Sequence, residues 1–176
     1  SDVYKRQLLG TAMNATAVTM LANRHTDDVR AVIACNGGVV PKAANDPLYV
    51  SMLNHPSINI SDFKEAHIPG LCGRDIPQER LNRCIWYGAK TQVADTAAAD
   101  VAVFARLSYE DISHVTMPYL LLNGGEDITV SPAVKRRLEQ LPACTSVTIP
   151  GGGHYLVMER PEETARAVKH FLTTLP

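Results

Sequence analysis

The chain has 176 residues, of which 45% are hydrophobic and 20% are charged, and its formal net charge is −1. This composition suffices for one buried core, and the near-zero charge argues against nucleic-acid or acidic-membrane partners. No apolar run reaches the roughly 18 residues of a membrane-spanning helix, and no signal peptide is visible. We therefore expect a globular protein, and the sequence leaves its oligomeric state open.

The cysteines carry no metal-ligand or C-x-x-C spacing, and no histidine pair has such a spacing either. Scattered cysteines of this kind are typical of free thiols in a reducing compartment. The sequence therefore predicts a cytoplasmic protein without a metal or other cofactor. The four cysteines are Cys35, Cys72, Cys84 and Cys144.

Residues 1–7 are polar where a strand that enters a core is expected to be apolar. Within them, DVYKRQ resembles the translation of a transposon-end adapter used in DNA library preparation. We interpret residues 1–7 as a non-native leader on a gene fragment from shotgun sequence. If strands are missing before Leu8, the first strand leaves an unpaired edge on its sheet.

The first core segment is expected at residues 8–38. Residues 13–23 have apolar side chains at helical spacing, which predicts a helix after a tight turn. Val29–Cys35 is a short apolar run that ends at Asn36-Gly37-Gly38. A run of this length followed by glycines favours a buried parallel strand. Asn36, at the end of that strand, either faces a functional site or only shapes a turn.

Residues 39–115 break this rhythm with prolines at 41, 47, 56, 69 and 77. Pro77–Tyr87 and Thr96–Leu107 are the best helical patches, so we interpret residues 39–115 as a helical insertion between two strands. Its aromatic residues either line a substrate pocket or form the insertion's own core. They are Tyr49, Phe63, Trp86 and Tyr87.

The strand–helix rhythm resumes over residues 116–176. Strands are predicted at Tyr119–Leu122 and Ser146–Ile149, with a helix between them that runs from the N-cap Ser131 to about Leu141. A last helix opens at Pro161. Its expected buried stripe is Ala165, Val168, Leu172 and Leu175. The alternation predicts an α/β fold whose parallel sheet has helices on both faces and functional groups at the carboxyl ends of its strands.

Two polar side chains follow these late strands. Asp127 stands at the end of the strand that begins at Tyr119, and His154 follows Gly151-Gly152-Gly153 at a strand-to-helix corner. An acid followed by a histidine is typical of the second half of a nucleophile–acid–histidine triad. A turn aspartate and a plain loop histidine are the alternatives, but the glycines and the pairing favour the triad.

The first half of such a triad is a nucleophile elbow, G-x-S-x-G, on a tight turn between a strand and a helix. Gly10 matches the first glycine, Ala12 stands where the serine is expected, and Asn14 replaces the second glycine. A methyl group cannot attack a carbonyl, so the chain has an acid and a base without a side-chain nucleophile.

These three pieces together resemble the α/β-hydrolase fold family, specifically its members with a helical cap. The resemblance implies that the chain is the carboxyl-terminal part of the family's parallel sheet, with residues 39–115 as the cap. It also implies that His154 is the general base, Asp127 its orienting carboxylate and Ala12 the substituted nucleophile position. The Met13 N–H would be one oxyanion donor. The family's second donor comes from a loop before the elbow strand, which this chain lacks.

Ala12 has three explanations. It is a lost serine, or it is natural in an enzyme without a covalent nucleophile, or it marks a descendant that only binds ligands. The pyrimidine-catabolic aminoacrylate hydrolases are similar in having alanine at this position. The resemblance implies hydrolysis of a small, mostly apolar ester, amide, lactone or similar bond, although this fragment is expected to be weakly active or inactive. The alternative is a noncatalytic homologue that senses a small ligand.

Overall fold

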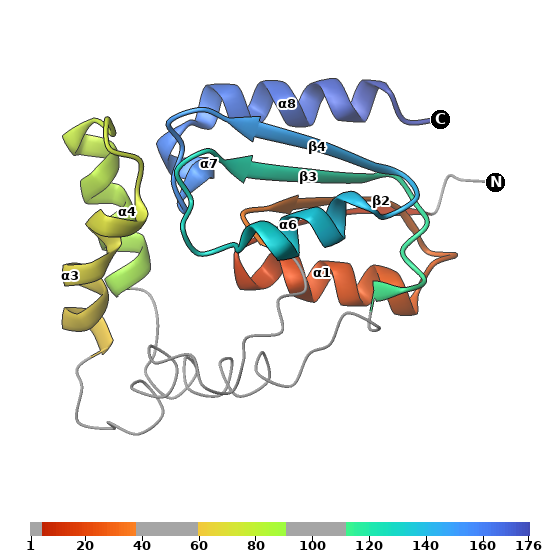
Figure 1. Cartoon of the computed structure of the whole chain (residues 1–176), viewed down its shortest axis with the longest axis horizontal. Coiled ribbons are helices and arrows are strands. Elements are labelled where there is room, and N and C mark those ends of the chain that lie inside the picture. The colour runs from red at the N-terminus through yellow and green to blue at the C-terminus, as the bar shows by residue number, and fades with distance from the viewer. Residues whose placement is uncertain (1–4, 38–59, 91–111) are drawn as a thin grey trace.

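The computed structural model describes residues 5–37, 60–90 and 112–176. In this part of the chain, four parallel strands form one sheet in the order β1-β2-β3-β4, and helices cover both of its faces (Figure 1). The predicted α/β fold class is therefore confirmed. The strands are β1 (Arg6–Thr11), β2 (Val29–Cys35), β3 (Tyr119–Gly124) and β4 (Cys144–Ile149). The helices are α1 (Met13–Arg24), α3 (Ile60–Leu71), α4 (Gln78–Lys90), α6 (Pro132–Glu139), α7 (Leu156–Glu159) and α8 (Pro161–Thr173).

The two central strands are the most apolar segments and the most deeply buried. Every residue of β3 is buried, and β2 is buried except at Arg30. Successive side chains of a strand point to opposite faces, so these strands feed two separate clusters. Tyr119 and Leu121 pack on the side of α1 and α6, whereas Leu120 and Leu122 pack on the side of α8. The short apolar runs thus fill the centre of a three-layer structure (Figure 1).

The helix α8 buries most of the predicted stripe. Val168, Leu172 and Leu175 pack partly buried on the α8 face of the sheet, whereas Ala165 is exposed. The most buried residues of the helix are Thr164 and Phe171. Because Pro161 opens the helix, its start was also predicted correctly.

The helices α3 and α4 pack against each other beyond the carboxyl ends of the strands (Figure 1). The helix α4 confirms the patch predicted at Pro77–Tyr87, whereas α3 was missed because Pro69 lies within its last turn. Their small core contains Ile68, Cys72, Cys84 and Ala89. Trp86 and Tyr87 are 64% and 56% exposed and stand outside this core, while Phe63 is half-buried. Tyr49 and Thr96–Leu107 lie outside the described residues.

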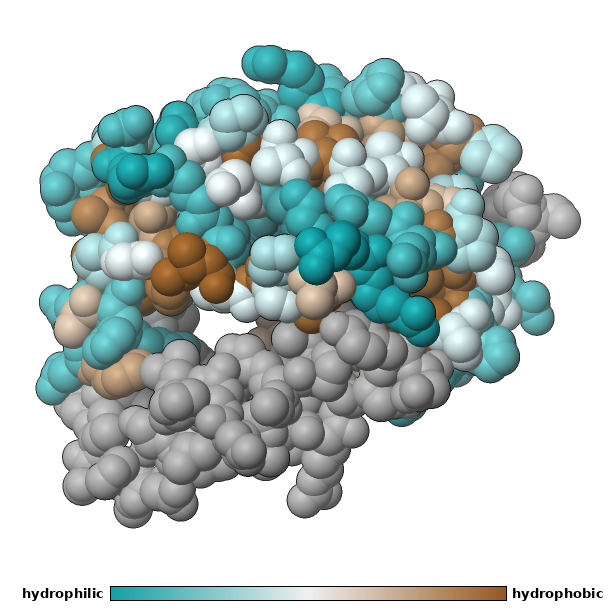
Figure 2. All heavy atoms as spheres, viewed as in Figure 1, coloured by the Kyte–Doolittle hydropathy of each residue, from teal (hydrophilic) through white to brown (hydrophobic). Residues whose placement is uncertain are grey.

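The outer surface is mixed in polarity. The face that carries α6 is largely hydrophilic (Figure 2). Among the described residues, no helix has the length and hydropathy that crossing a membrane requires.

The strand β1 is one of the two edge strands of the described sheet and differs from the central strand β3 in burial. Leu9 in β1 is 55% exposed, whereas Leu121 in β3 is fully buried. We expect Leu121→Ala to lower the free energy of unfolding by about 2–5 kcal/mol, because it removes buried methyl groups and leaves a cavity. Leu9→Ala, the matched control, should change it by less than about 0.5 kcal/mol. Urea unfolding measures both, and equal losses would contradict the assigned burial.

Candidate active site

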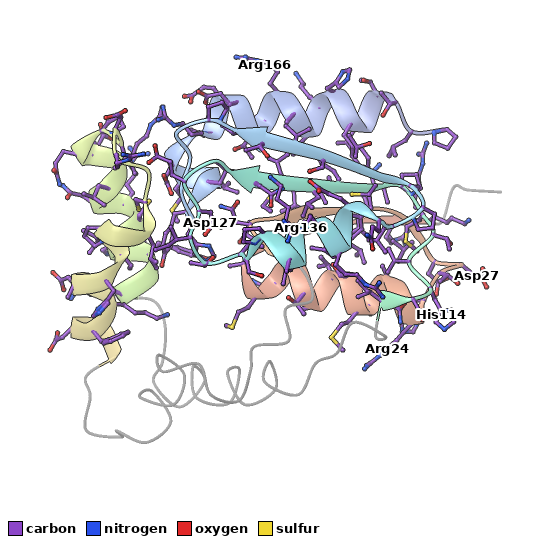
Figure 3. The ribbon with its side chains drawn as sticks, viewed as in Figure 1. Arg24, Asp27, His114, Asp127, Arg136 and Arg166 are labelled. Carbon is purple, nitrogen blue, oxygen red and sulfur yellow. The ribbon has the colours of Figure 1, made fainter. Side chains whose placement is uncertain are left out.

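The predicted site residues gather at the carboxyl end of the sheet. The strand register pairs Thr11 with Cys35, Cys35 with Leu122, and Gly124 with Ile149, so the four strands end side by side. Figure 3 shows Asp127 at this end, facing α4, while Arg24, Asp27 and His114 lie at the opposite end. The chain therefore brings the turns that follow its strands to one location.

Asp127 and His154 are in direct contact there. His154 Nδ1 lies 3.1 Å from Asp127 Oδ2. Thr129 joins the pair: its hydroxyl donates to Asp127 Oδ1 at 2.7 Å, and its oxygen lies 2.8 Å from His154 Nδ1. The Thr129 N–H also donates to Asp127 Oδ1, at 2.8 Å. The carboxylate is nearly enclosed, with a side-chain exposure of 3%, whereas the imidazole is 18% exposed.

These contacts determine the protonation of the pair. Burial opposes ionisation of Asp127, but the hydrogen bond and charge interaction with His154, together with the Thr129 hydrogen bonds, outweigh it and lower the pKa of the carboxyl. An ionised carboxylate only accepts hydrogen bonds, and the Thr129 proton is directed to Asp127. His154 Nδ1 is therefore the donor in this contact, and Nε2 is the ring nitrogen that is left to act as an acceptor.

Asn36 connects two segments of the site. They are the end of β3, which leads to Asp127, and residues 150–155, which carry His154 and are called the histidine loop below. Its side chain is buried, and its Oδ1 accepts from the Gly124 N–H at 2.7 Å. Its Nδ2 donates to the backbone oxygens of Gly153 and His154 at 2.6 Å and 2.9 Å. Asn36 has a φ of 47°, in the left-handed region that asparagine tolerates better than most residues. Asn36 was expected either to face a functional site or only to shape a turn. In the structure it shapes a turn and also contacts the candidate site.

The elbow keeps its strained backbone without its serine. Ala12 has φ 50° and ψ −120°, a conformation that side-chain-bearing residues rarely adopt. Its N–H donates to the Cys35 oxygen at 2.9 Å, which holds the turn against the end of β2. A Cβ at Gly10 would lie 2.3 Å from the Asn14 oxygen, so the turn requires glycine there. Met13 follows as the first residue of α1, where N–H groups have no partner within the helix.

Sequence reasoning missed two polar residues of this region. Thr129, two positions after Asp127, carries no motif of its own, and Glu159 was quoted only as part of the stretch after His154. Glu159 is buried and accepts from the N–H groups of Gly153 and Tyr155. Within residues 5–37, 60–90 and 112–176, no group of three or more histidine, cysteine, aspartate or glutamate side chains is arranged to hold a metal ion.

Comparison with known families identifies the fold. The sequence model of the protein family described as "Alpha/beta hydrolase family" matches residues 5–167, so the chain belongs to that family. A search of curated protein sequences found no match.

Solved structures agree with this assignment. A thermophilic esterase from Thermogutta terrifontis superposes with a TM-score of 0.84 at 21% identity, over 97% of this chain and 65% of the esterase. The enol-lactonase from Burkholderia xenovorans LB400 gives 0.81 at 20% identity, over 97% and 66%. A bromoperoxidase from Bacillus anthracis gives 0.81 at 20% identity, over 95% and 67%. The chain thus spans about two thirds of each of these proteins, and at these identities the likeness shows the fold.

The elbow strain has a measurable consequence. We expect Ala12→Gly to raise the free energy of unfolding by about 1 kcal/mol, because glycine adopts a positive φ without steric cost. Ala17→Gly, in the exposed face of the adjacent helix α1, should lower it by about 1 kcal/mol through lost helix propensity. Thermal and urea unfolding of both variants test this pair, and the same sign for the two changes would contradict the assigned elbow geometry.

The pKa of Asp127 predicts a pH dependence. Because the folded-state pKa lies below the ordinary value of 3.8, the ionised Asp127 carboxylate stabilises the fold above that value and loses its contribution as pH falls through the lowered pKa. The difference in unfolding free energy between the wild type and Asp127→Asn should therefore shrink from about pH 5 to about pH 2. Urea titrations across this range measure it, and a constant or growing difference would refute the assignment.

Proposed function

We propose that this member of the α/β-hydrolase family hydrolyses a small, mostly apolar molecule at an ester, amide, lactone or similar bond. The observation that carries the proposal is the 3.1 Å contact between His154 Nδ1 and Asp127 Oδ2 at the carboxyl end of the sheet. A carboxylate that fixes Nδ1–H leaves Nε2 as a general base and stabilises the imidazolium that forms when the base accepts a proton.

In the proposed reaction water replaces the missing side-chain nucleophile. The water oxygen bonds to the carbonyl carbon while His154 Nε2 accepts the water proton, and the carbonyl π electrons move to oxygen. The resulting tetrahedral anion collapses, the bond to the leaving group breaks, and the imidazolium returns the proton to the leaving oxygen or nitrogen. Ala12 contributes a small apolar surface and no covalent intermediate.

We assign the backbone N–H of Met13 to the anion that forms in this reaction. It is the first N–H of α1, where the helix dipole favours negative charge. Because Ala12 cannot supply a covalent nucleophile, we expect this chain to be a weak catalyst.

Two further features support the substrate class and setting. The α3–α4 pair stands beyond the strand ends, where it would cover a small ligand (Figure 1). Two similar structures are named as an esterase and an enol-lactonase, which favours an ester or lactone among the candidate bonds. All four cysteines are free, which supports a reducing, cytoplasmic setting.

The substitution at Ala12 favours a second candidate, a noncatalytic module that binds a small ligand between the sheet and the α3–α4 pair. Such a protein would hold its ligand at the same place with no bond broken. It would show saturable binding of an ester or lactone without product.

We expect His154→Ala to reduce turnover of short esters and lactones by at least about 100-fold, because general-base assistance is lost. His170→Ala, in the exposed part of α8, is the matched control and should leave turnover unchanged. The assay uses this chain and, where its gene encodes a longer product, that product as well. Equal rates for His154→Ala and wild type would reject the assignment.

Ala12→Ser separates the two candidates. An intact acid–histidine pair should activate the restored hydroxyl, so a serine-directed covalent probe should label Ala12→Ser but not Ala12→Ser combined with His154→Ala. Mass spectrometry measures the adduct. Labelling together with slow wild-type turnover supports the hydrolase, whereas ligand binding without turnover or labelling supports the binding module.

A further inference from the structure

Glu159 is a buried carboxylate in the short helix α7, with an exposure of 1%. Its Oε2 accepts from the backbone N–H groups of Gly73 at 2.7 Å and Gly153 at 2.8 Å. Its Oε1 accepts from the Tyr155 N–H at 2.8 Å. A buried carboxylate is costly unless hydrogen bonds replace its hydration. Three backbone N–H groups therefore take the place of the water that would hydrate this carboxylate at the surface.

Two of these contacts surround the candidate base. Gly153 and Tyr155 are the residues on either side of His154, so one carboxylate fixes the backbone before and after the imidazole. The His154 N–H donates to the Leu71 oxygen at 2.7 Å, and its own oxygen accepts from Asn36. The direction in which the imidazole leaves the backbone is consequently set by these hydrogen bonds.

The third contact comes from the connection between α3 and α4. Gly73 shares Oε2 with Gly153, and Leu71 accepts from His154 two residues earlier in the same connection. A Cβ at Gly153 would lie 2.5 Å from the Gly73 nitrogen and from the Leu71 oxygen, so the two backbones touch without room for a side chain. The segment 71–73 and the histidine loop thus form one hydrogen-bonded unit.

A buried thiol lies in the segment that bonds to this carboxylate. The hydrogen bond with Cys84, burial, and the interaction with Glu159 all raise the pKa of Cys72, so this thiol keeps its proton. Cys72 lies between Leu71, which accepts from the His154 N–H, and Gly73, which donates to Glu159.

We propose that Glu159 is a positioning residue, which sets the orientation of His154 toward Asp127 and ties it to the seating of segment 71–73 on the histidine loop. The catalytic consequence rests on the proposed function, but the coupling is a property of the fold alone. When segment 71–73 is displaced, Oε2 loses one of its two donors and the loop around His154 loses its anchor.

The sharpest variant is Glu159→Gln, which keeps the size of the side chain. An amide has one oxygen and one NH₂ group, so at least one of the three backbone N–H groups then faces a donor. Glu162→Gln is the matched control. Glu162 lies three residues away and forms an ion pair at 3.0 Å with the half-buried Arg80. Arg80 also donates to the Glu159 backbone oxygen at 2.8 Å, so this control perturbs the same neighbourhood while it leaves the three N–H bonds of the Glu159 side chain in place.

The readout is the proton shared by His154 Nδ1 and Asp127, which resonates far downfield of the amides in proton NMR spectra. Asp127→Asn assigns it by its loss. We expect Glu159→Gln to abolish this resonance or shift it, while Glu162→Gln leaves it at the wild-type position. A folded Glu159→Gln chain with an unchanged resonance would overturn the proposal.

Amide exchange in the wild-type protein keeps the proposal testable if Glu159→Gln does not fold. One carboxylate holds the N–H groups of Gly73, Gly153 and Tyr155, so their protection factors should agree within about threefold and change together with temperature. If Gly73 exchanges tenfold or more faster than the other two, the segment opens by itself and the coupling is wrong.

Kinetics separate this inference from the proposed function. If the chain turns over an ester, Glu159→Gln should lower kcat about 10- to 100-fold with KM within twofold, because the base is misplaced while the binding surface remains. If the wild type turns over the ester and Glu159→Gln has the same kcat, the positioning role is wrong and the hydrolase function stands. No wild-type turnover, with the NMR and exchange results as expected, rejects the hydrolase function and supports the coupling.

Discussion

The candidate site depends on one buried amide. Asn36 ends β2 and uses both halves of its side chain, with Oδ1 on the N–H of Gly124 and Nδ2 on the carbonyl oxygens of Gly153 and His154. The parallel sheet brings these segments to the same end, but it leaves the turns beyond the strands free to diverge. A buried amide with all these partners is expensive to disrupt, because each lost hydrogen bond leaves a polar group without water. It therefore holds the segment of Asp127 against the loop of His154, and their 3.1 Å contact follows from that arrangement.

Local signals were sufficient for much of this architecture. The short apolar run Val29–Cys35 forms the predicted strand with the predicted bounds, because its largely apolar and partly β-branched sequence suits a site buried on both faces. Ser131 caps α6 as expected, with its Oγ accepting from the Val134 N–H at 3.3 Å. The order of the acid and the histidine predicted their meeting, since both follow strands of one parallel sheet. Their catalytic role stays a prediction, because proximity and hydrogen bonding do not measure chemistry.

What the sequence left undetermined depends on contacts between distant segments. Glu159 is buried because Gly73, far away in the chain, approaches it, and no spacing within its own helix signals that partner. Thr129 has the composition of an ordinary turn residue, and its contact with both Asp127 and His154 exists only once the loop has closed. The helix α8 shows a smaller limit of the same kind: Val168, Leu172 and Leu175 face the sheet as predicted, but Ala165 is exposed and the polar Thr164 is buried instead. The burial of polar residues inside the protein is thus a tertiary property.

The elbow presents the sharpest physical question in this chain. Holding Ala12 at φ 50° costs about 1–3 kcal/mol, and in a serine hydrolase that strain serves to present the hydroxyl. Here no hydroxyl is present, yet the turn still starts α1 at the carboxyl end of β1 and places the Met13 N–H at the first position of the helix. Under the proposed reaction the strain is therefore used to direct a backbone donor and to leave a methyl-sized space, rather than to hold a nucleophile. A base at the same end of the sheet as this methyl group suits attack by water, since a water molecule needs room and a proton acceptor but no covalent attachment to the chain.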